Sequence, residues 1–128
     1  MKKILVVDDE ADMLAVWIEQ IRLWGVPAEV HTADNGVDAL ATILKHKKFD
    51  LIITDFSMPG MNGLEFIQAF RKNDTDTAVF LFSAYIPEVA FLSEQIENVF
   101  FFEKPIITKK LKTQIKTILE TSGPIESV

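Results

Sequence analysis

The chain has 128 residues, of which 48% are hydrophobic and 25% are charged, and its formal net charge is −6. This length and composition predict one globular domain with a sizeable core. The acidic balance argues against direct binding to nucleic acid and against a basic helix on a membrane surface, because both need clustered positive charge.

Three features of the sequence bear on where the protein works. No cysteine is present, which rules out disulfides and thiolate metal sites and fits a reducing compartment. No apolar run approaches the roughly 20 residues of a membrane span. The first apolar run meets acids at 8–10, too early for the core of a signal peptide. We therefore expect a cytoplasmic protein.

Apolar runs and turn residues divide the chain into alternating strands and helices. In chain order we predict strand 3–8, helix 11–24, strand 28–33, helix 37–46, strand 50–55, helix 64–72, strand 78–83, helix 87–97, strand 99–103 and helix 106–121. This alternation indicates an α/β fold, with a parallel sheet covered by helices on both faces. Residues 1–121 form one domain, and residues 122–128 form a tail or the start of a linker.

Polar side chains stand where four of these strands end. Asp8 and Asp9 follow the first strand, Asp55 ends the third, Ser83 ends the fourth, and Lys104 follows the fifth. Ligands of open parallel sheets bind outside the carboxyl ends of the strands, so these residues are expected to converge. Three carboxylates and one ammonium suggest a site for a divalent metal and a phosphoryl group.

The chemistry of such a site follows from its residue types. Mg²⁺ prefers oxygen ligands, which Asp8, Asp9, Asp55 and the backbone carbonyl of Ser57 could supply, and Mn²⁺ is an alternative. A carboxylate can also attack phosphorus and form an aspartyl phosphate. Lys104 and the Ser83 hydroxyl could then neutralise or bind phosphoryl oxygens.

Each of these residues also has a plain structural interpretation. Asp9 could simply cap the following helix, Ser83 could be a turn residue, and Lys104 could be solvated. Independent surface residues need not coincide with the ends of four strands, however. The combined pattern therefore favours a functional site.

At this point the chain resembles the response-regulator receiver domains, the CheY-like family of two-component signalling. The matching segments are VVDDE at 6–10, LIITDFSMPGMNG at 51–63, LFSAY at 81–85 and FFEKP at 101–105, and the resemblance spans about 3–121. It implies a flavodoxin-like (βα)5 three-layer sandwich. CheY is a standard example of that fold, with strand order 2-1-3-4-5.

The resemblance also implies roles for individual residues. Asp55 would accept a phosphoryl group from the phosphohistidine of a sensor histidine kinase or a histidine phosphotransferase, or from acetyl phosphate. Asp8, Asp9 and the Ser57 carbonyl would help to hold Mg²⁺, and Ser83 and Lys104 would contact the phosphoryl group. The bond from Lys104 to Pro105 would be cis.

Such a domain would act as a switch that changes partner binding. The resemblance implies that Ser83 moves toward the phosphoryl group while Phe101 turns inward. Ala84 leaves room for that shift, and Tyr85 flanks the path of an attacking water. We expect Phe100 and Phe102, on the opposite face of the strand, to be core residues.

Two other functions stay open. One is a Mg²⁺-dependent phosphohydrolase with an aspartyl-phosphate intermediate, and the other is a pseudo-receiver that serves as a scaffold without phosphorylation. The leading prediction is a signalling module that catalyses only its own phosphorylation and dephosphorylation. Its downstream partner or output domain is not indicated, and the chain could stand alone or belong to a longer protein.

Two features of the sequence lie outside that site. The helix at 11–24 is apolar on nearly all sides, which indicates either a docking surface for a kinase or deep burial. His31 and His46, the two histidines, fall on different predicted elements and are assigned no catalytic or metal-binding role.

Overall fold

The computed structural model describes residues 1–104 and 109–121, without the side chains of residues 109, 110 and 121. In chain order its elements are β1 (Lys2–Val7), α1 (Ala11–Leu23), β2 (Ala28–Ala33), α2 (Gly36–His46), β3 (Leu51–Asp55), α3 (Gly63–Arg71), β4 (Ala78–Ser83), α4 (Pro87–Glu94), β5 (Val99–Glu103) and α5 (Lys109–Thr121). The predicted alternation of strands and helices is confirmed, and most boundaries agree within one residue.

The fourth helix is shorter than predicted. It ends at Glu94 rather than at residue 97. Asn98 has φ of 62°, in the left-handed region, so the helix cannot run on into β5. The beginning of the predicted fifth helix, the bond between Lys104 and Pro105, and the predicted tail at 122–128 lie outside the described residues.

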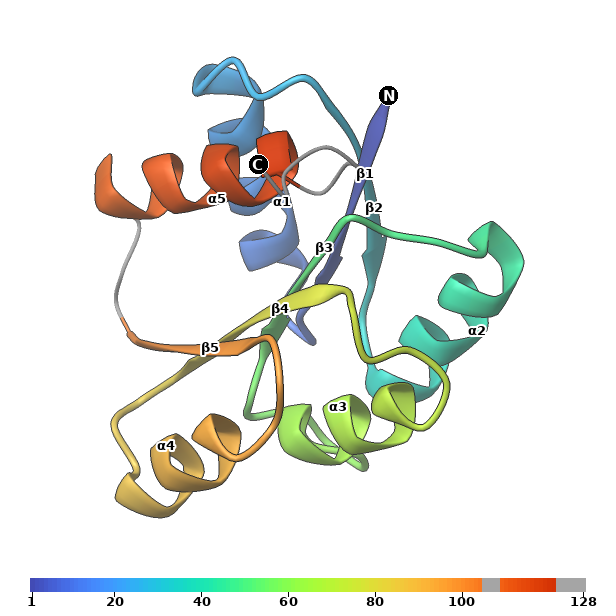
Figure 1. Cartoon of the computed structure of the whole chain (residues 1–128), viewed down its shortest axis with the longest axis vertical. Coiled ribbons are helices and arrows are strands. Elements are labelled where there is room, and N and C mark those ends of the chain that lie inside the picture. The colour runs from blue at the N-terminus through green and yellow to red at the C-terminus, as the bar shows by residue number, and fades with distance from the viewer. Residues whose placement is uncertain (105–108, 122–128) are drawn as a thin grey trace.

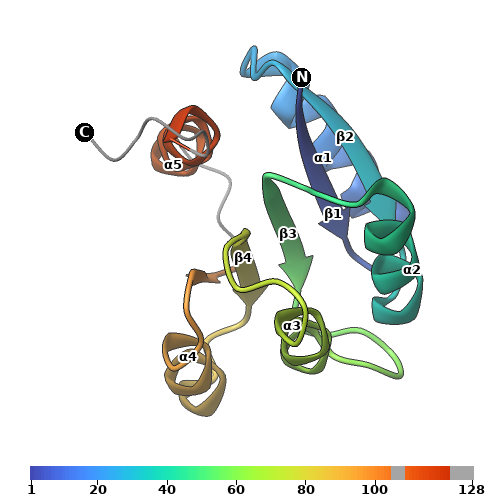
Figure 2. The same ribbon diagram turned by 45° about the vertical axis from the view of Figure 1, so that its right-hand side comes forward.

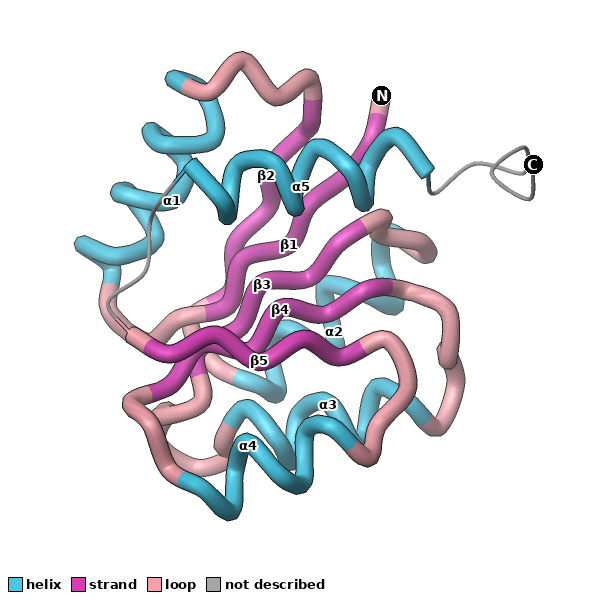
Figure 3. Tube along the Cα trace, turned by 60° about the vertical axis from the view of Figure 1, so that its left-hand side comes forward, coloured by secondary structure: helices cyan, strands magenta, loops and turns pink. Residues whose placement is uncertain are grey.

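The five strands form one parallel sheet in the order β2-β1-β3-β4-β5, as the resemblance implied. Helices α1 and α5 cover one face, and α2, α3 and α4 cover the other, which gives three layers (Figures 1 and 3). All carboxyl ends of the strands therefore meet at one edge of the sheet. This edge is where the predicted site residues follow their strands.

The two faces of the sheet carry separate hydrophobic cores because strand side chains alternate between faces. Trp17 of α1 packs its ring edge-on against Phe82 of β4, in the core under α1 and α5. Phe66 and Ile67 of α3 are fully buried in the other core. The central strands β1, β3 and β4 are buried on both faces, which explains their continuous apolar sequences.

The aromatic residues of the edge strand β5 divide differently from the prediction. Phe102 lies in the core beneath α5, as expected. Phe100 points to the same face but is 41% exposed, so its assignment to the core is wrong. Its ring meets Phe80 edge-on at a centroid distance of 5.8 Å. An edge strand has no further strand beyond it to cover such a side chain.

The two histidines are neighbours in space although they lie on different elements. The rings of His31 on β2 and His46 at the end of α2 are 4.3 Å apart, and both rings contact Phe49. His31 Nε2 also lies 3.0 Å from a carboxylate oxygen of Glu29. Neither histidine belongs to the acidic cluster Asp8, Asp9 and Asp55.

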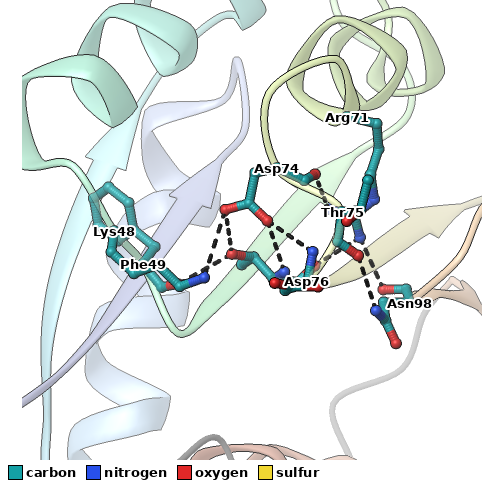
Figure 4. A network of polar contacts seen from close by, with 8 residues as sticks. Lys48, Phe49, Arg71, Asp74, Thr75, Asp76 and Asn98 are labelled. Atoms are coloured by element: carbon teal, nitrogen blue, oxygen red, sulfur yellow. Dashed lines mark hydrogen bonds and ion pairs between the residues drawn. The ribbon is translucent and has the colours of Figure 1, made fainter.

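The amino edge of the sheet is held by a polar network (Figure 4). The Arg71 guanidinium donates hydrogen bonds to the carbonyls of Asp74, Thr77, Glu97 and Asn98, at 2.6–3.3 Å. The side-chain amide of Asn98 donates to the Thr75 carbonyl at 3.0 Å. This network ties the loop before β4 to the loop before β5.

The described helices were also compared with the requirements of a membrane span. None of them combines the length and the apolar character that crossing a bilayer needs.

Candidate phosphorylation site

The carboxyl edge of the sheet gathers three acidic side chains from two strands. Asp8 and Asp9 follow β1, and Asp55 is the last residue of the adjacent β3. One carboxylate oxygen from each lies within 4.8 Å of the others. Asp8 and Asp55 are buried, whereas Asp9 is exposed. Parallel pairing of neighbouring strands thus brings together the carboxylates that the sequence placed at strand ends.

Two hydrogen bonds with neighbouring backbone groups position Asp8. Its amide donates to the Ala33 carbonyl of the β2 strand at 3.1 Å, and its Oδ1 accepts from the Glu10 amide at 2.9 Å. Glu10 is the N-cap of α1, and within the described part of the chain neither its side chain nor Asp9 caps this helix. The simple capping role considered for Asp9 is therefore wrong.

The electrostatics of this edge oppose the ionised form of Asp8. Burial raises the pKa of Asp8 to about 6, and the negative charges of Asp55 and Asp9 add to the rise. The hydrogen bond from the Glu10 amide and the positive charge of Lys104 act in the opposite direction without cancelling it. A divalent cation at this edge would relieve the same repulsion.

Asp55 and Lys104 form an ion pair across the edge of the sheet. The Lys104 amide donates to the Ser83 carbonyl at 2.8 Å, which continues the pairing of β4 with β5 and aims the lysine at Asp55. The ammonium and Asp55 Oδ1 lack hydrogen-bond geometry, so among residues 1–104 and 109–121 this buried oxygen accepts no hydrogen bond. Its charged partner among these residues is the Lys104 ammonium, and a divalent cation could neutralise the same carboxylate.

The donor set fits a hard divalent cation. Three carboxylates converge, and no thiolate competes, since the chain has no cysteine. Mg²⁺ and Mn²⁺ both favour such oxygen ligands. The described residues can therefore hold a divalent metal at this edge.

Gly63 is a residue of the site that the sequence interpretation did not single out. Its amide donates to the Phe56 carbonyl at 2.8 Å. A Cβ atom at this position would lie 2.5 Å from the Asp55 carbonyl oxygen and 2.8 Å from Cα of Phe56. Only glycine allows α3 to begin so close to Asp55. The Asn62-Gly63 pair, a common turn sequence, is the only signal of this position in the sequence.

The loop between Asp55 and α3 is fixed at both ends. Asn62 and Glu65 form a reciprocal capping box, in which Asn62 Oδ1 accepts from the Glu65 amide at 2.8 Å. Met58 is buried beneath the loop. Ser57 lies between these anchors, two residues after Asp55, where its carbonyl was predicted to join the metal ligands.

Ser83 and its neighbours lie beside the carboxylates. The Ser83 side chain is buried, and its hydroxyl donates to the Ala84 carbonyl at 2.6 Å. Phe101 is half-buried, and the exposed Tyr85 ring meets it edge-on at a centroid distance of 6.5 Å. The hydroxyl is thus bound to the adjacent peptide, a detail that the sequence could not indicate.

An apolar cavity of about 430 Å³ opens beside the carboxylates. Met13 and Trp17 of α1 form one wall, Phe82 of β4 forms another, and Asp55 and Lys104 line it as well. The sequence did not predict this cavity, because it depends on how α1 sits over the sheet.

Helix α1 is only partly buried. Trp17 and Ile21 are buried in the core, which explains part of its apolar content. Val16, Ile18 and Leu23 are exposed. Deep burial therefore accounts for only part of the apolar content, and docking of a kinase on this helix stays a prediction.

Comparison with known proteins agrees with this geometry. The family model of the response regulator receiver domain matches residues 4–116. The transcriptional regulatory protein PrrA of Mycobacterium tuberculosis is 32% identical over 124 residues, which cover 94% of this chain and 51% of PrrA. The chain therefore spans about half the length of this curated relative.

Solved structures give the same result. The response regulator TrrA of Thermotoga maritima, solved with Mg²⁺ and BeF, is 34% identical, with a TM-score of 0.78 over 92% of this chain and 99% of TrrA. TrrA was also solved in complex with the histidine kinase ThkA. The chemotaxis protein CheY4 of Vibrio cholerae is 28% identical, with a TM-score of 0.80 over 92% of this chain and 98% of CheY4. The chain belongs to the response regulator receiver domain family.

Proposed function

We propose that Asp55 is the phosphoacceptor of a switch in two-component signalling. Its donor would be the phosphohistidine of a sensor histidine kinase or phosphotransferase, or a small molecule such as acetyl phosphate. The observation that carries this proposal is the state of Asp55 Oδ1. This oxygen belongs to a buried carboxylate and is paired with the Lys104 ammonium, and the carboxylates of Asp8 and Asp9 converge on the same place.

The transfer step is a displacement at phosphorus. A carboxylate oxygen of Asp55 forms the new bond to phosphorus while the bond from phosphorus to the donor imidazole nitrogen breaks, and that nitrogen keeps the electron pair. Lys104 neutralises charge on one phosphoryl oxygen, and the Ser83 hydroxyl donates to another. Because Gly63 has no Cβ atom, α3 can begin against the Asp55 backbone without a steric clash.

Mg²⁺, or Mn²⁺ in its place, would be held by Asp8, Asp9, Asp55 and the Ser57 carbonyl. When bound, the metal neutralises carboxylate and phosphoryl oxygens that would otherwise repel each other. Asp8 must be ionised to serve as a ligand, and its raised pKa means that metal and proton compete for it.

The same residues provide a switch. The Ser83 hydroxyl must leave the Ala84 carbonyl before it can donate to a phosphoryl oxygen. That movement displaces Ala84 and Tyr85, and Tyr85 lies against Phe101. Phosphorylation would therefore alter the packing of Phe101 and the surface around the start of α4. Tyr85 would also shape the access of the water that hydrolyses the aspartyl phosphate.

The kinase or phosphotransferase would dock on α1. The exposed side chains of Val16 and Ile18 lie on the helix that begins beside the carboxylates. The structure of TrrA with ThkA shows that a relative of this chain binds a histidine kinase. We place this exchange in the cytoplasm and expect no turnover of an external substrate beyond the phosphodonor.

Labelling with a phosphodonor tests this function. Radiolabelled acetyl phosphate with Mg²⁺ should modify the wild-type protein at one site, and removal of the metal with EDTA should abolish the modification. Asp55→Asn should take up no label, whereas Asp76→Asn, the same change at an exposed position on the amino edge, should label like the wild type. No labelling of the wild type would point to a pseudo-receiver. Continuous release of phosphate from phosphate esters would point to a hydrolase.

A further inference from the structure

Helix α2 exposes an apolar stripe on its outer side. Val37, Ala41 and Leu44 are all exposed, and their spacing of four and three residues places them on one face of the helix. Val37 is 64% exposed and Leu44 is 80% exposed. Single exposed apolar residues are common, but an aligned series on the outer face of a surface helix is not expected.

The stripe borders a groove between α2 and α3. Figure 2 shows α2 at the right of the strands and α3 next to it below β3. The groove has a volume of about 500 Å³, and its apolar wall comes mainly from Leu40, Ile43 and Leu44 of α2 and from Ala69 and Phe70 of α3. An apolar side chain from another molecule could therefore be accommodated beside the stripe.

Charges flank the stripe in a regular order. Asp38 lies in the first turn of α2 and Lys45 in the last turn, and both are exposed. They are two turns apart, so they lie on the same flank of the stripe. Asp34 precedes the helix and Lys47 follows it, which extends the same polarity. The outer side of α2 is thus acidic at one end, apolar in the middle and basic at the other end.

We infer that this face binds a second copy of the chain, with the two α2 helices antiparallel. A two-fold axis near Ala41 would bring Val37 of each copy to Leu44 of the other. The same rotation keeps the charged flanks on one side, so Asp38 of each copy meets Lys45 of the other. The small Ala41 side chain allows close approach, and antiparallel helix dipoles attract.

Charge complementarity selects the second copy over other occupants. The exposed apolar patch of α4, which includes Phe91 and Leu92, shows the contrast. Its helix carries only acidic charges, Glu88 and Glu94, so an antiparallel copy would bring like charges together. The α2 face is self-complementary and the α4 face is not.

Sedimentation equilibrium of the unphosphorylated, metal-free protein tests this inference. It goes beyond the phosphoryl-transfer proposal, because no residue of the stripe belongs to the site at the carboxyl edge. We expect the wild type to dimerise with a dissociation constant between about 1 μM and 1 mM, as small interfaces do. Asp38→Lys alone and Lys45→Asp alone should each weaken the dimer by about tenfold or more, since each change creates two repulsive pairs.

Mixing the two charge variants provides the sharpest readout. One then contributes two lysines and the other two aspartates, so the mixture should form a heterodimer with about wild-type affinity. Leu44→Glu should abolish dimerisation, and Phe91→Glu on α4 should preserve it. Circular dichroism would verify folding of each variant.

Several outcomes would overturn the inference. A wild type that stays monomeric up to about 1 mM lies outside the affinity range of a specific dimer. A dimer that survives Leu44→Glu, or one that is lost in Phe91→Glu, would place the interface elsewhere. Mixed charge variants that fail to associate would contradict the antiparallel arrangement.

Discussion

Aspartate side chains have different surroundings at the amino edge and at the carboxyl edge of the sheet. At the amino edge, Asp74 Oδ1 accepts from the amides of Asp76 and Thr77 at 2.9 Å each, and Oδ2 accepts from the Thr77 hydroxyl at 2.8 Å (Figure 4). At the carboxyl edge, the buried Asp55 Oδ1 accepts no hydrogen bond among the described residues. Asp74 is held by hydrogen bonds from its own loop, whereas Asp55 is paired with Lys104 and lies beside two further carboxylates.

The pKa values of the two edges differ accordingly. Burial alone would raise the pKa of Asp74, but the hydrogen bonds from Thr77 and Asp76, together with the charge of Lys48, lower it overall. Burial raises the pKa of Asp8, and nearby carboxylates add to that rise. Asp74 therefore stabilises the fold as an anion, whereas ionised Asp8 destabilises the metal-free protein. Stability is concentrated at one edge and reactivity at the other.

Replacing one lysine at each edge should give the largest difference in the rate of phosphorylation. Lys104→Ala removes the ammonium paired with Asp55, so the rate of phosphorylation by acetyl phosphate should fall by about a hundredfold or more. Lys48→Ala removes an exposed cation that lies 3.8 Å from Asp74 at the amino edge, and it should leave that rate unchanged. Equal rates for the wild type and Lys104→Ala would show that Lys104 does not contribute to phosphorylation.

Adding a methyl group beside Asp55 should have the second-largest effect, on both stability and phosphorylation. Gly63→Ala places a Cβ against the Asp55 backbone, which cannot yield as a side chain could, so we expect a loss of about 2–3 kcal/mol in the free energy of unfolding. Phosphorylation should slow as well. Gly36→Ala is the matched control, because its Cβ would meet only the flexible Met61 side chain. Urea denaturation of both variants would measure the difference, and equal losses would contradict the proposed tight packing.

Truncation at the amino edge should affect stability without affecting chemistry. Asp74→Ala leaves the amides of Asp76 and Thr77 and the Thr77 hydroxyl without their acceptor, at a cost of about 2 kcal/mol. Phosphorylation of the folded fraction should stay at the wild-type rate. The stabilisation by Asp74 is present above pH 3.8 and is lost as the pH falls through its lower folded-state pKa. Urea titrations at several pH values would detect this loss.

The smallest expected effect is a gain in the free energy of unfolding rather than a loss. Asp8→Asn should stabilise the metal-free protein at pH 7 by about 1–2 kcal/mol, because it removes a buried charge that neighbouring carboxylates repel. The folded-state pKa of about 6 exceeds the usual aspartate pKa of 3.8. The wild type should therefore gain stability as the pH falls from 7 through 6 toward 4, and Asp8→Asn should lack this gain. Destabilisation by Asp8→Asn at pH 7 would show that the edge is not strained.

The sequence predicted the elements well because their signals are local. Apolar runs and turn residues marked all the strands, and parallel pairing then brought Asp8, Asp55, Ser83 and Lys104 to one edge. Long-range packing escaped prediction. Alternation gave the face of Phe100 but not its exposure, because exposure depends on what covers the edge strand.

Other details of the site depended on contacts between distant segments. The close approach at Gly63 arises only when α3 folds against Asp55, and the Ser83 hydroxyl could have pointed either to its own peptide or to the carboxylates. The pairing of His31 with His46 likewise follows from how α2 packs beside β2. Residue type indicated the chemistry of the carboxyl edge, but only the folded chain shows that Asp55 is buried and paired with Lys104.

The central claim is that Asp55 accepts a phosphoryl group at a metal-dependent site confined to the carboxyl edge. Two-dimensional NMR with Mg²⁺ and beryllofluoride, a mimic of the phosphoryl group, tests it most directly. We predict shifts in the amide signals of Asp55, Ser83, Phe101 and Lys104, unchanged signals for Asp74 and Asn98 at the amino edge, and no response in Asp55→Asn. An unperturbed wild-type spectrum, or the same shifts in Asp55→Asn, would contradict the claim.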